Sequence, residues 1–239
     1  MMVSKKRVMF YIDGFNLYYG SLRGTPYRWL DLEAFCQAYV RPGYAFSGAR
    51  YFTAKLRAHP SNPGQSDRQR QYLRAIGTLP NISIHYGHFL HRTAVRQLEL
   101  LPRDARDGDI GLLSVWIHEE KGSDVNLATH LVADGFRHRF DLAVVVSNDS
   151  DLKTPISFIR SNFTPVGVLN PHSARERSFA LSPRDLPDGS FYRTIKKSTL
   201  QKALLSSALE DAEGTIECPL GWRTNLQSRP KAALHSAHR

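Results

Sequence analysis

The sequence Arg7-Val8-Met9-Phe10-Tyr11-Ile12-Asp13-Gly14 lies close to the N-terminus and decides the fold class. Its β-branched and aromatic residues are typical of a buried strand, which the acidic residue and the glycine end. Basic residues precede it, as in a signal peptide, but the apolar run from Val8 to Ile12 is too short for the apolar core of one. We therefore interpret residues 7–13 as the first strand.

Strands and helices alternate along the chain, a pattern that favours an α/β fold with a parallel sheet. Further strands are predicted at residues 49–56, 82–90, 112–118, 142–146 and 165–169. Helices are predicted at residues 31–40, 66–76, 123–136 and 155–160, and residues 92–111 are predicted to form a loop or hairpin. From residue 171 the order weakens to a helix at 174–181, a proline-rich connector at 182–189 and a helix at 198–210.

The charge balance favours a polyanionic partner such as nucleic acid. The 239 residues include 32 Lys and Arg against 22 Asp and Glu, a net charge of +10. Much of the excess lies in residues 55–106, which carry nine basic and three acidic side chains. A solvated, solubilising surface would give the same balance, so charge alone leaves both interpretations open.

Several classes of protein are excluded by what the sequence lacks. No apolar stretch is long enough to span a membrane. The two cysteines, Cys36 and Cys218, are too few and too far apart in sequence for a disulfide framework or a cysteine metal site, which favours a reducing, cytoplasmic compartment. The motifs of dinucleotide-binding folds, P-loop NTPases, zinc proteases and nucleophile-elbow hydrolases are missing.

Four aspartates occur at predicted strand ends or at a helix start: Asp13, Asp124, Asp149 and Asp151. Parallel sheets bind ligands outside the carboxyl ends of their strands, so Asp13 and the loop at 147–151 share one site if their strands are neighbours. Asp124 lies on the same helical stripe as Ala128 and Leu131, which aims its carboxylate at the edge of the sheet. Converging carboxylates repel one another unless a cation neutralises them, and oxygen ligands suit Mg²⁺ or Mn²⁺. Turn formation or helix capping is the alternative role for each aspartate.

Three segments resemble the signature blocks of the NYN domain family, relatives of the PIN-domain ribonucleases. They are Tyr11-Ile12-Asp13-Gly14-Phe15-Asn16, Lys121-Gly122-Ser123-Asp124-Val125-Asn126-Leu127-Ala128 and Val146-Ser147-Asn148-Asp149-Ser150-Asp151-Leu152. Residues 50–55 and 86–90 are similar to the proteobacterial branch of that family. The resemblance implies a PIN-like α/β/α sandwich with a central, mostly parallel sheet, an acidic pocket that holds Mg²⁺ or Mn²⁺, and action on RNA.

The matched motifs also imply roles for individual residues. Asp13, Asp124 and Asp149 take the catalytic and metal-binding positions, and Asp151 takes a further metal-binding position. The candidates for substrate binding are Asn16, Ser147 and Lys121. Two positions depart from the family, since His130 stands where many members have an acid and Asn148 where they usually have glycine. His130 is about 120° around the helix from Asp124, so its role stays open.

The resemblance covers residues 6–170, which we expect to form a nuclease domain. The weaker order after it predicts an accessory segment at 171–225, and the basic residues 226–239 are predicted to be a disordered tail. The accessory segment has no recognisable chemistry. Packing on the domain, formation of a homodimer and binding of RNA are all compatible with its sequence.

Aromatic residues follow the first acid closely: Tyr18, Tyr19, Tyr27 and Trp29. Packing against the sheet is the favoured role for these side chains. Stacking on the bases of a single strand is the alternative.

Our first hypothesis is a Mg²⁺- or Mn²⁺-dependent ribonuclease, with single-stranded RNA as the favoured substrate. The second is a non-catalytic RNA-binding or regulatory module that keeps the acidic pocket. A third, a phosphatase of the haloacid dehalogenase type, requires a second aspartate two residues after the first, where this chain has Phe15.

Overall fold

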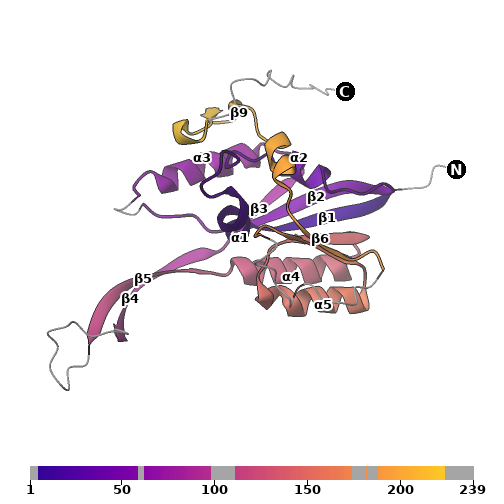
Figure 1. Cartoon of the computed structure of the whole chain (residues 1–239), viewed down its shortest axis with the longest axis horizontal. Coiled ribbons are helices and arrows are strands. Elements are labelled where there is room, and N and C mark those ends of the chain that lie inside the picture. The colour runs from indigo at the N-terminus through magenta and orange to yellow at the C-terminus, as the bar shows by residue number, and fades with distance from the viewer. Residues whose placement is uncertain (1–4, 59–61, 98–110, 174–180, 182–187, 224–239) are drawn as a thin grey trace.

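The computed structural model of the protein describes residues 5–58, 62–97, 111–173, 181 and 188–223. Its centre is a sheet in the order β3–β2–β1–β6–β7–β8, in which all neighbouring strands are parallel (Figure 1). The strands are β1 (Lys6–Asp13), β2 (Tyr44–Thr53), β3 (Ile82–Tyr86), β6 (Leu142–Val146), β7 (Val166–Asn170) and β8 (Phe191–Thr194). The predicted α/β fold with a central parallel sheet is confirmed.

Helices cover both faces of this sheet (Figure 1). One face carries α1 (Gly14–Leu17), the π-helix η1 (Tyr18–Leu22), α2 (Leu32–Gln37) and α3 (Gln65–Gly77), and the other carries α4 (Ser123–Phe136) and α5 (Lys153–Asn162). Because side chains alternate along a strand, Phe10 and Ile12 of β1 enter one hydrophobic core and Tyr11 enters the other. Within the described ranges, no helix is long and apolar enough to cross a membrane.

The predicted strand at residues 82–90 is in fact two strands, because the chain leaves the sheet at Gly87. The Gly87 amide still donates to the Thr53 carbonyl at 2.8 Å. After it, β4 (His88–Gln97) pairs antiparallel with β5 (Leu112–Lys121), and the two project from the body as an arm (Figure 1). The region predicted as a loop or hairpin is therefore a hairpin, of which residues 98–110 lie outside the described residues.

The C-terminal residues join the same body. The sequence does not predict β8, which extends the sheet beside β7. Further side chains enter the core around Trp29: Leu200, Leu204, Leu205 and Trp222. The predictions for residues 174–180, 182–187 and 226–239 concern parts of the chain outside the described residues.

The helix predicted at residues 198–210 is wrong beyond residue 202. The structure has α6 (Lys197–Lys202), followed by a hairpin of β9 (Ala208–Asp211) and β10 (Gly214–Glu217). The chain turns away because the Leu205 amide donates to the Trp29 carbonyl at 3.0 Å, and the Trp29 indole N–H donates to the Ser206 carbonyl at 2.7 Å. These contacts come from a residue distant in sequence, which helical periodicity does not report.

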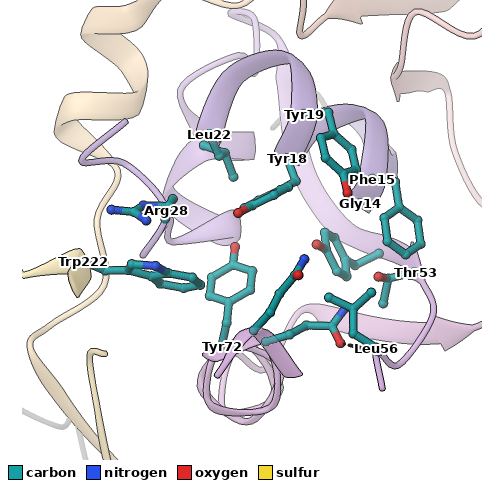
Figure 2. A pocket seen from close by; sticks show the side chains of 13 residues that line it. Gly14, Phe15, Tyr18, Tyr19, Leu22, Arg28, Thr53, Leu56, Tyr72 and Trp222 are labelled. Carbon is teal, nitrogen blue, oxygen red and sulfur yellow. Dashed lines mark hydrogen bonds between the residues drawn. The ribbon is translucent and has the colours of Figure 1, made fainter. Parts of the chain in front are cut away.

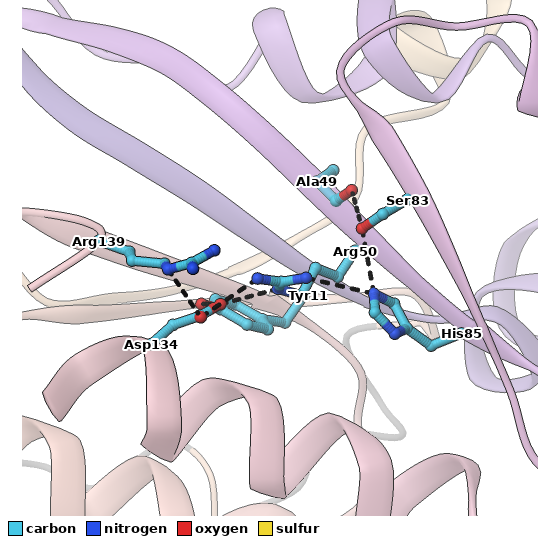
Figure 3. A network of polar contacts seen from close by, with 7 residues as sticks. All are labelled: Tyr11, Ala49, Arg50, Ser83, His85, Asp134 and Arg139. Carbon is cyan, nitrogen blue, oxygen red and sulfur yellow. Dashed lines mark hydrogen bonds and ion pairs between the residues drawn. The ribbon is translucent and has the colours of Figure 1, made fainter. Parts of the chain in front are cut away.

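A buried ion pair joins the sheet to α4 (Figure 3). Arg50 donates to the Asp134 carboxylate through Nε at 2.7 Å and Nη2 at 3.2 Å, and the Tyr11 hydroxyl donates to it at 2.8 Å. Arg50 Nη1 lies 3.3 Å from Nε2 of His85, whose ring centroid is 4.2 Å from that of His130. Burial, together with the His130 and Arg50 charges, lowers the pKa of His85 to about 4. His130 therefore packs beside this network.

Candidate active site

Two of the predicted acids meet where neighbouring strands end. Ile12 pairs with Val146 in the β1–β6 register, so Asp13 and the loop that carries Asp149 leave the same edge of the sheet. The strand order reverses at this pair, which is the usual ligand-binding position of open parallel sheets. Asp124 reaches the place from the first turn of α4. All three aspartates line one pocket of about 430 Å³.

Asp13 is held rigidly at the floor of this pocket. It caps α1, since Oδ1 accepts from the Asn16 amide at 2.9 Å, and its Oδ2 accepts from the Ser147 hydroxyl at 3.0 Å. The next residue must be glycine, because a Cβ on Gly14 would lie 2.6 Å from Cζ of Tyr51. The carboxylate of Asp13 is consequently fixed in place before any ligand binds.

The loop after β6 is tied to the first acid by side chains. Asn16 Oδ1 accepts from the Asn148 amide at 2.8 Å, and the Ser147 hydroxyl accepts from the Asp149 amide at 3.1 Å. Asp149 in turn caps the 3₁₀-helix η2 (Ser150–Leu152), because its Oδ1 accepts from the Asp151 amide at 2.9 Å. These bonds set the position of Asp149 relative to Asp13.

Glu120 is a member of the pocket that sequence reasoning missed. Its carboxylate accepts from the Ser123 amide at 3.1 Å and from the Ser123 hydroxyl at 2.8 Å, which fixes the start of α4. It also lines the pocket, as do His172 and the rings of Phe15 and Phe89. The sequence signal for Glu120 is an acid shortly before a helix, a pattern too common to mark a site.

The carboxylates perturb one another. Burial raises the pKa of Asp13 from 3.8 to about 7, and the charges of Asp124 and Asp149 add to that rise. Burial raises the pKa of Asp124 to about 6, with contributions from Asp149, Glu120 and Asp151. Near neutral pH the pocket therefore favours a bound proton or a cation over a set of bare carboxylates.

The donor set fits a hydrated divalent cation better than an enclosed one. Within the described residues, no three acidic, histidine or cysteine side chains are grouped closely enough to hold a metal ion by themselves. Mg²⁺ keeps several of its waters and commonly binds through one or two carboxylates. Asp13, Asp124 and Asp149 supply oxygen donors of this kind, and the pKa is raised at Asp13 and Asp124.

The remaining predicted residues take other places. Of the substrate-binding candidates, Asn16 lines the pocket, and Ser147 is buried beneath it with its hydroxyl on Asp13. Lys121 is half exposed and its ammonium donates to Glu119 at 2.6 Å. Among the described residues that line the pocket, neither Lys121 nor Asp151 is included. Asp151 is exposed, yet close enough to raise the pKa of Asp124.

Comparison with known proteins identifies similar sequences. Residues 7–182 match the NYN domain. The chain is 32% identical over 192 residues to 6-hydroxy-3-succinoylpyridine 3-monooxygenase HspA of Pseudomonas putida, an alignment that covers 72% of this chain and 62% of that protein. A solved structure of a Vibrio parahaemolyticus protein of unknown function is 18% identical, with a TM-score of 0.48, and the match covers 85% of this chain and 100% of that one.

Proposed function

The chain belongs to the NYN domain family, and we propose that it hydrolyses RNA phosphodiester bonds at the pocket lined by Asp13, Asp124 and Asp149, with Mg²⁺ or Mn²⁺ bound there. The observation that carries this proposal is the convergence of carboxylates from β1, α4 and the loop after β6 in one pocket, where the pKa is raised at Asp13 and Asp124. Perturbed acids gathered in a pocket are a common sign of catalysis. The resemblance of the three motifs to the family is confirmed by the match over residues 7–182.

Each residue has a distinct part in this proposal. Asp13, Asp124 and Asp149 hold the cation, with Asp151 as a further candidate ligand. A divalent ion in such a site lowers the pKa of a bound water and neutralises charge on the phosphate. Ser147 and Asn16 position the carboxylates, because their hydrogen bonds join Asp13 to the loop after β6.

The RNA backbone is gripped by basic side chains beside the acids. Lys121 is the last residue of β5, next to Glu120. Its surface ion pair with Glu119 contributes little free energy, so the lysine can exchange that partner for a phosphate at little cost. Arg92 and Arg96 extend along β4 on the arm. Single-stranded RNA is the proposed substrate, because the rings of Phe15 and Phe89 at the pocket suit unpaired bases.

The direct test is cleavage of a labelled single-stranded RNA with Mn²⁺, with EDTA, and by the variants Asp13→Asn and Asp149→Asn. Asp67→Asn is the matched control, since Asp67 is exposed on α3 and pairs only with Arg70 among the described residues. Cleavage that needs the metal, is lost in both site variants and is kept in the control supports the proposal. Binding of RNA without cleavage under every condition would favour the non-catalytic module.

A second candidate function is hydroxylation of a heteroaromatic compound, as the name of the Pseudomonas relative describes for that protein. An aromatic pocket beside the acids favours it. We rank it second because the chain spans only 62% of that relative. Incubation with 6-hydroxy-3-succinoylpyridine, O₂ and a two-electron donor, followed by analysis for the hydroxylated product, tests it directly.

A further inference from the structure

A second pocket shares lining residues with the acidic one but has a different character. Figure 2 shows its lining. Tyr18 from η1 and Tyr72 from α3 point toward one another across it, with Trp222 at one end and Leu56 at the other. We call it the aromatic pocket. The ring centroids of Tyr72 and Trp222 are 6.3 Å apart, and those of Tyr51 and Tyr72 are 6.5 Å apart, both with edge contacts.

Two polar side chains in the walls of the aromatic pocket, Gln69 and Tyr72, already have partners in the protein. The Gln69 side chain accepts from the Leu56 amide at 2.8 Å and donates to the Ala54 carbonyl at 2.9 Å. The Tyr72 hydroxyl donates to the Leu30 carbonyl at 3.0 Å. Because these groups have partners in the protein, the walls offer ring faces and apolar surface.

The aromatic pocket has little charge in its lining, and its charged side chain already has partners in the protein. Of the described residues that line it none is acidic, and Arg28 is the charged one. The Arg28 guanidinium donates to the Thr25 and Gly221 carbonyls and stacks over the Trp222 ring at 5.4 Å. A neutral, flat ring fits this lining better than a phosphate does, because the one cation already donates to backbone carbonyls.

The two pockets are continuous. Phe15, Tyr19 and Leu56 line both of them. The π-helical turn at Tyr18–Leu22 places Tyr18 in the aromatic pocket and Tyr19 at its border with the acids. A ligand with a phosphate among the carboxylates and a flat ring attached nearby would therefore fill both.

We propose that the aromatic pocket holds the base of a nucleotide next to the phosphate that lies among Asp13, Asp124 and Asp149. This inference rests on the proposed function. The pocket is small, with a volume of about 60 Å³, so in this proposal one ring occupies it in part while the rest of the nucleotide stays outside. The four aromatic residues that follow the first acid fall into two groups. Tyr27 and Trp29 are buried in the core, whereas Tyr18 and Tyr19 face the pockets.

The experiment removes one base at a time from a short, fluorescently labelled single-stranded RNA and measures binding in EDTA, where no cleavage occurs. Base stacking on aromatic side chains is worth on the order of ten-fold in affinity per base. We expect an abasic residue at one position to weaken binding to the wild-type protein by about that factor. Tyr18→Leu removes a wall, and Leu56→Trp places a larger side chain on a partly exposed loop residue where the two pockets meet. Both variants should lose this position-specific penalty.

The matched control is Phe136→Leu, which removes an exposed aromatic ring on α4 away from both pockets. It should keep the wild-type penalty. Equal penalties in all four proteins at every position would overturn the inference, and so would Tyr18-dependent binding of a free pyridine carboxylate without any base effect in RNA. Cleavage with Mn²⁺ is scored separately: cleavage without the base effect refutes the base pocket alone, and the base effect without cleavage refutes the nuclease proposal alone.

Discussion

Replacing Asp13 with asparagine should stabilise the metal-free protein at alkaline pH while it abolishes cleavage. Burial, with the charges of Asp124 and Asp149, raises the pKa of Asp13 from 3.8 to about 7. Between these values the folded state keeps a proton that the unfolded state has released, so the free energy of unfolding falls as the pH rises through this range. A shift of about three units, at about 1.4 kcal/mol each, gives a penalty of at most about 4 kcal/mol above pH 7.

Asparagine removes this penalty and keeps the local structure. Its side-chain oxygen can accept from the Asn16 amide, and its nitrogen can donate to the Ser147 oxygen. Urea unfolding in EDTA at about pH 5 and about pH 8.5 measures the effect, with Asp67→Asn as the control. The stabilisation should be almost complete at the higher pH and should fall to less than half of that at the lower one, because pH 5 still lies above the unfolded pKa of 3.8.

Stabilisation by a bound metal tests the same carboxylate independently. Mn²⁺ should stabilise the wild-type protein at about pH 8.5 by mass action and should have much less effect on Asp13→Asn. A variant that is no more stable than the wild type at this pH, or one whose gain does not depend on pH, would refute the reasoning that Asp13 is a strained, desolvated carboxylate.

Three further predictions concern the scaffold, each measured by urea unfolding. The folded pKa of His85 is about 4, below its usual 6.5, so stability should fall as the pH drops from 6.5 toward 4, and His85→Gln should flatten that slope. Arg50→Met should cost about 3–5 kcal/mol because it leaves the Asp134 carboxylate buried without its bidentate partner, and adding Asp134→Leu should restore much of the loss. Gly14→Ala should destabilise the fold by more than about 1–2 kcal/mol, well above the roughly 0.5 kcal/mol of an ordinary surface substitution, because its Cβ would lie 2.6 Å from Cζ of Tyr51. A near-neutral effect would show that this segment is not tightly packed.

Local patterns were enough to predict the elements on which the acids stand. The helix at Ser123–Phe136 and the strand at Leu142–Val146 have the bounds expected from periodicity and β-branched composition. Asp13 and Asp149 meet because their strands are adjacent, a condition that the sequence allowed without requiring. Open parallel α/β sheets commonly reverse their strand order at one point, and β1 and β6 are the neighbouring strands at that point here.

Features that depend on distant contacts were not predictable in this way. The chain leaves the sheet at Gly87, between β3 and β4, because the neighbouring strand β2 ends at that level. The residues around Gly87 do not signal this end. The helix expected beyond Lys202 is replaced by a turn that Trp29 holds from the other end of the chain. Glu120 joins the pocket only because the arm returns to the sheet at the start of α4.

Trp222 brings to the aromatic pocket a wall from outside the residues that match the family. The carboxylates all lie inside residues 7–182, the part shared with the family, whereas one wall of the aromatic pocket comes from a residue well beyond it. Substitutions in the C-terminal segment can thus change the lining of the aromatic pocket while the three carboxylates stay the same. A shortened chain that stops where the family match stops would lose that wall together with part of the core around Trp29, so the border of sequence similarity is a poor place to cut.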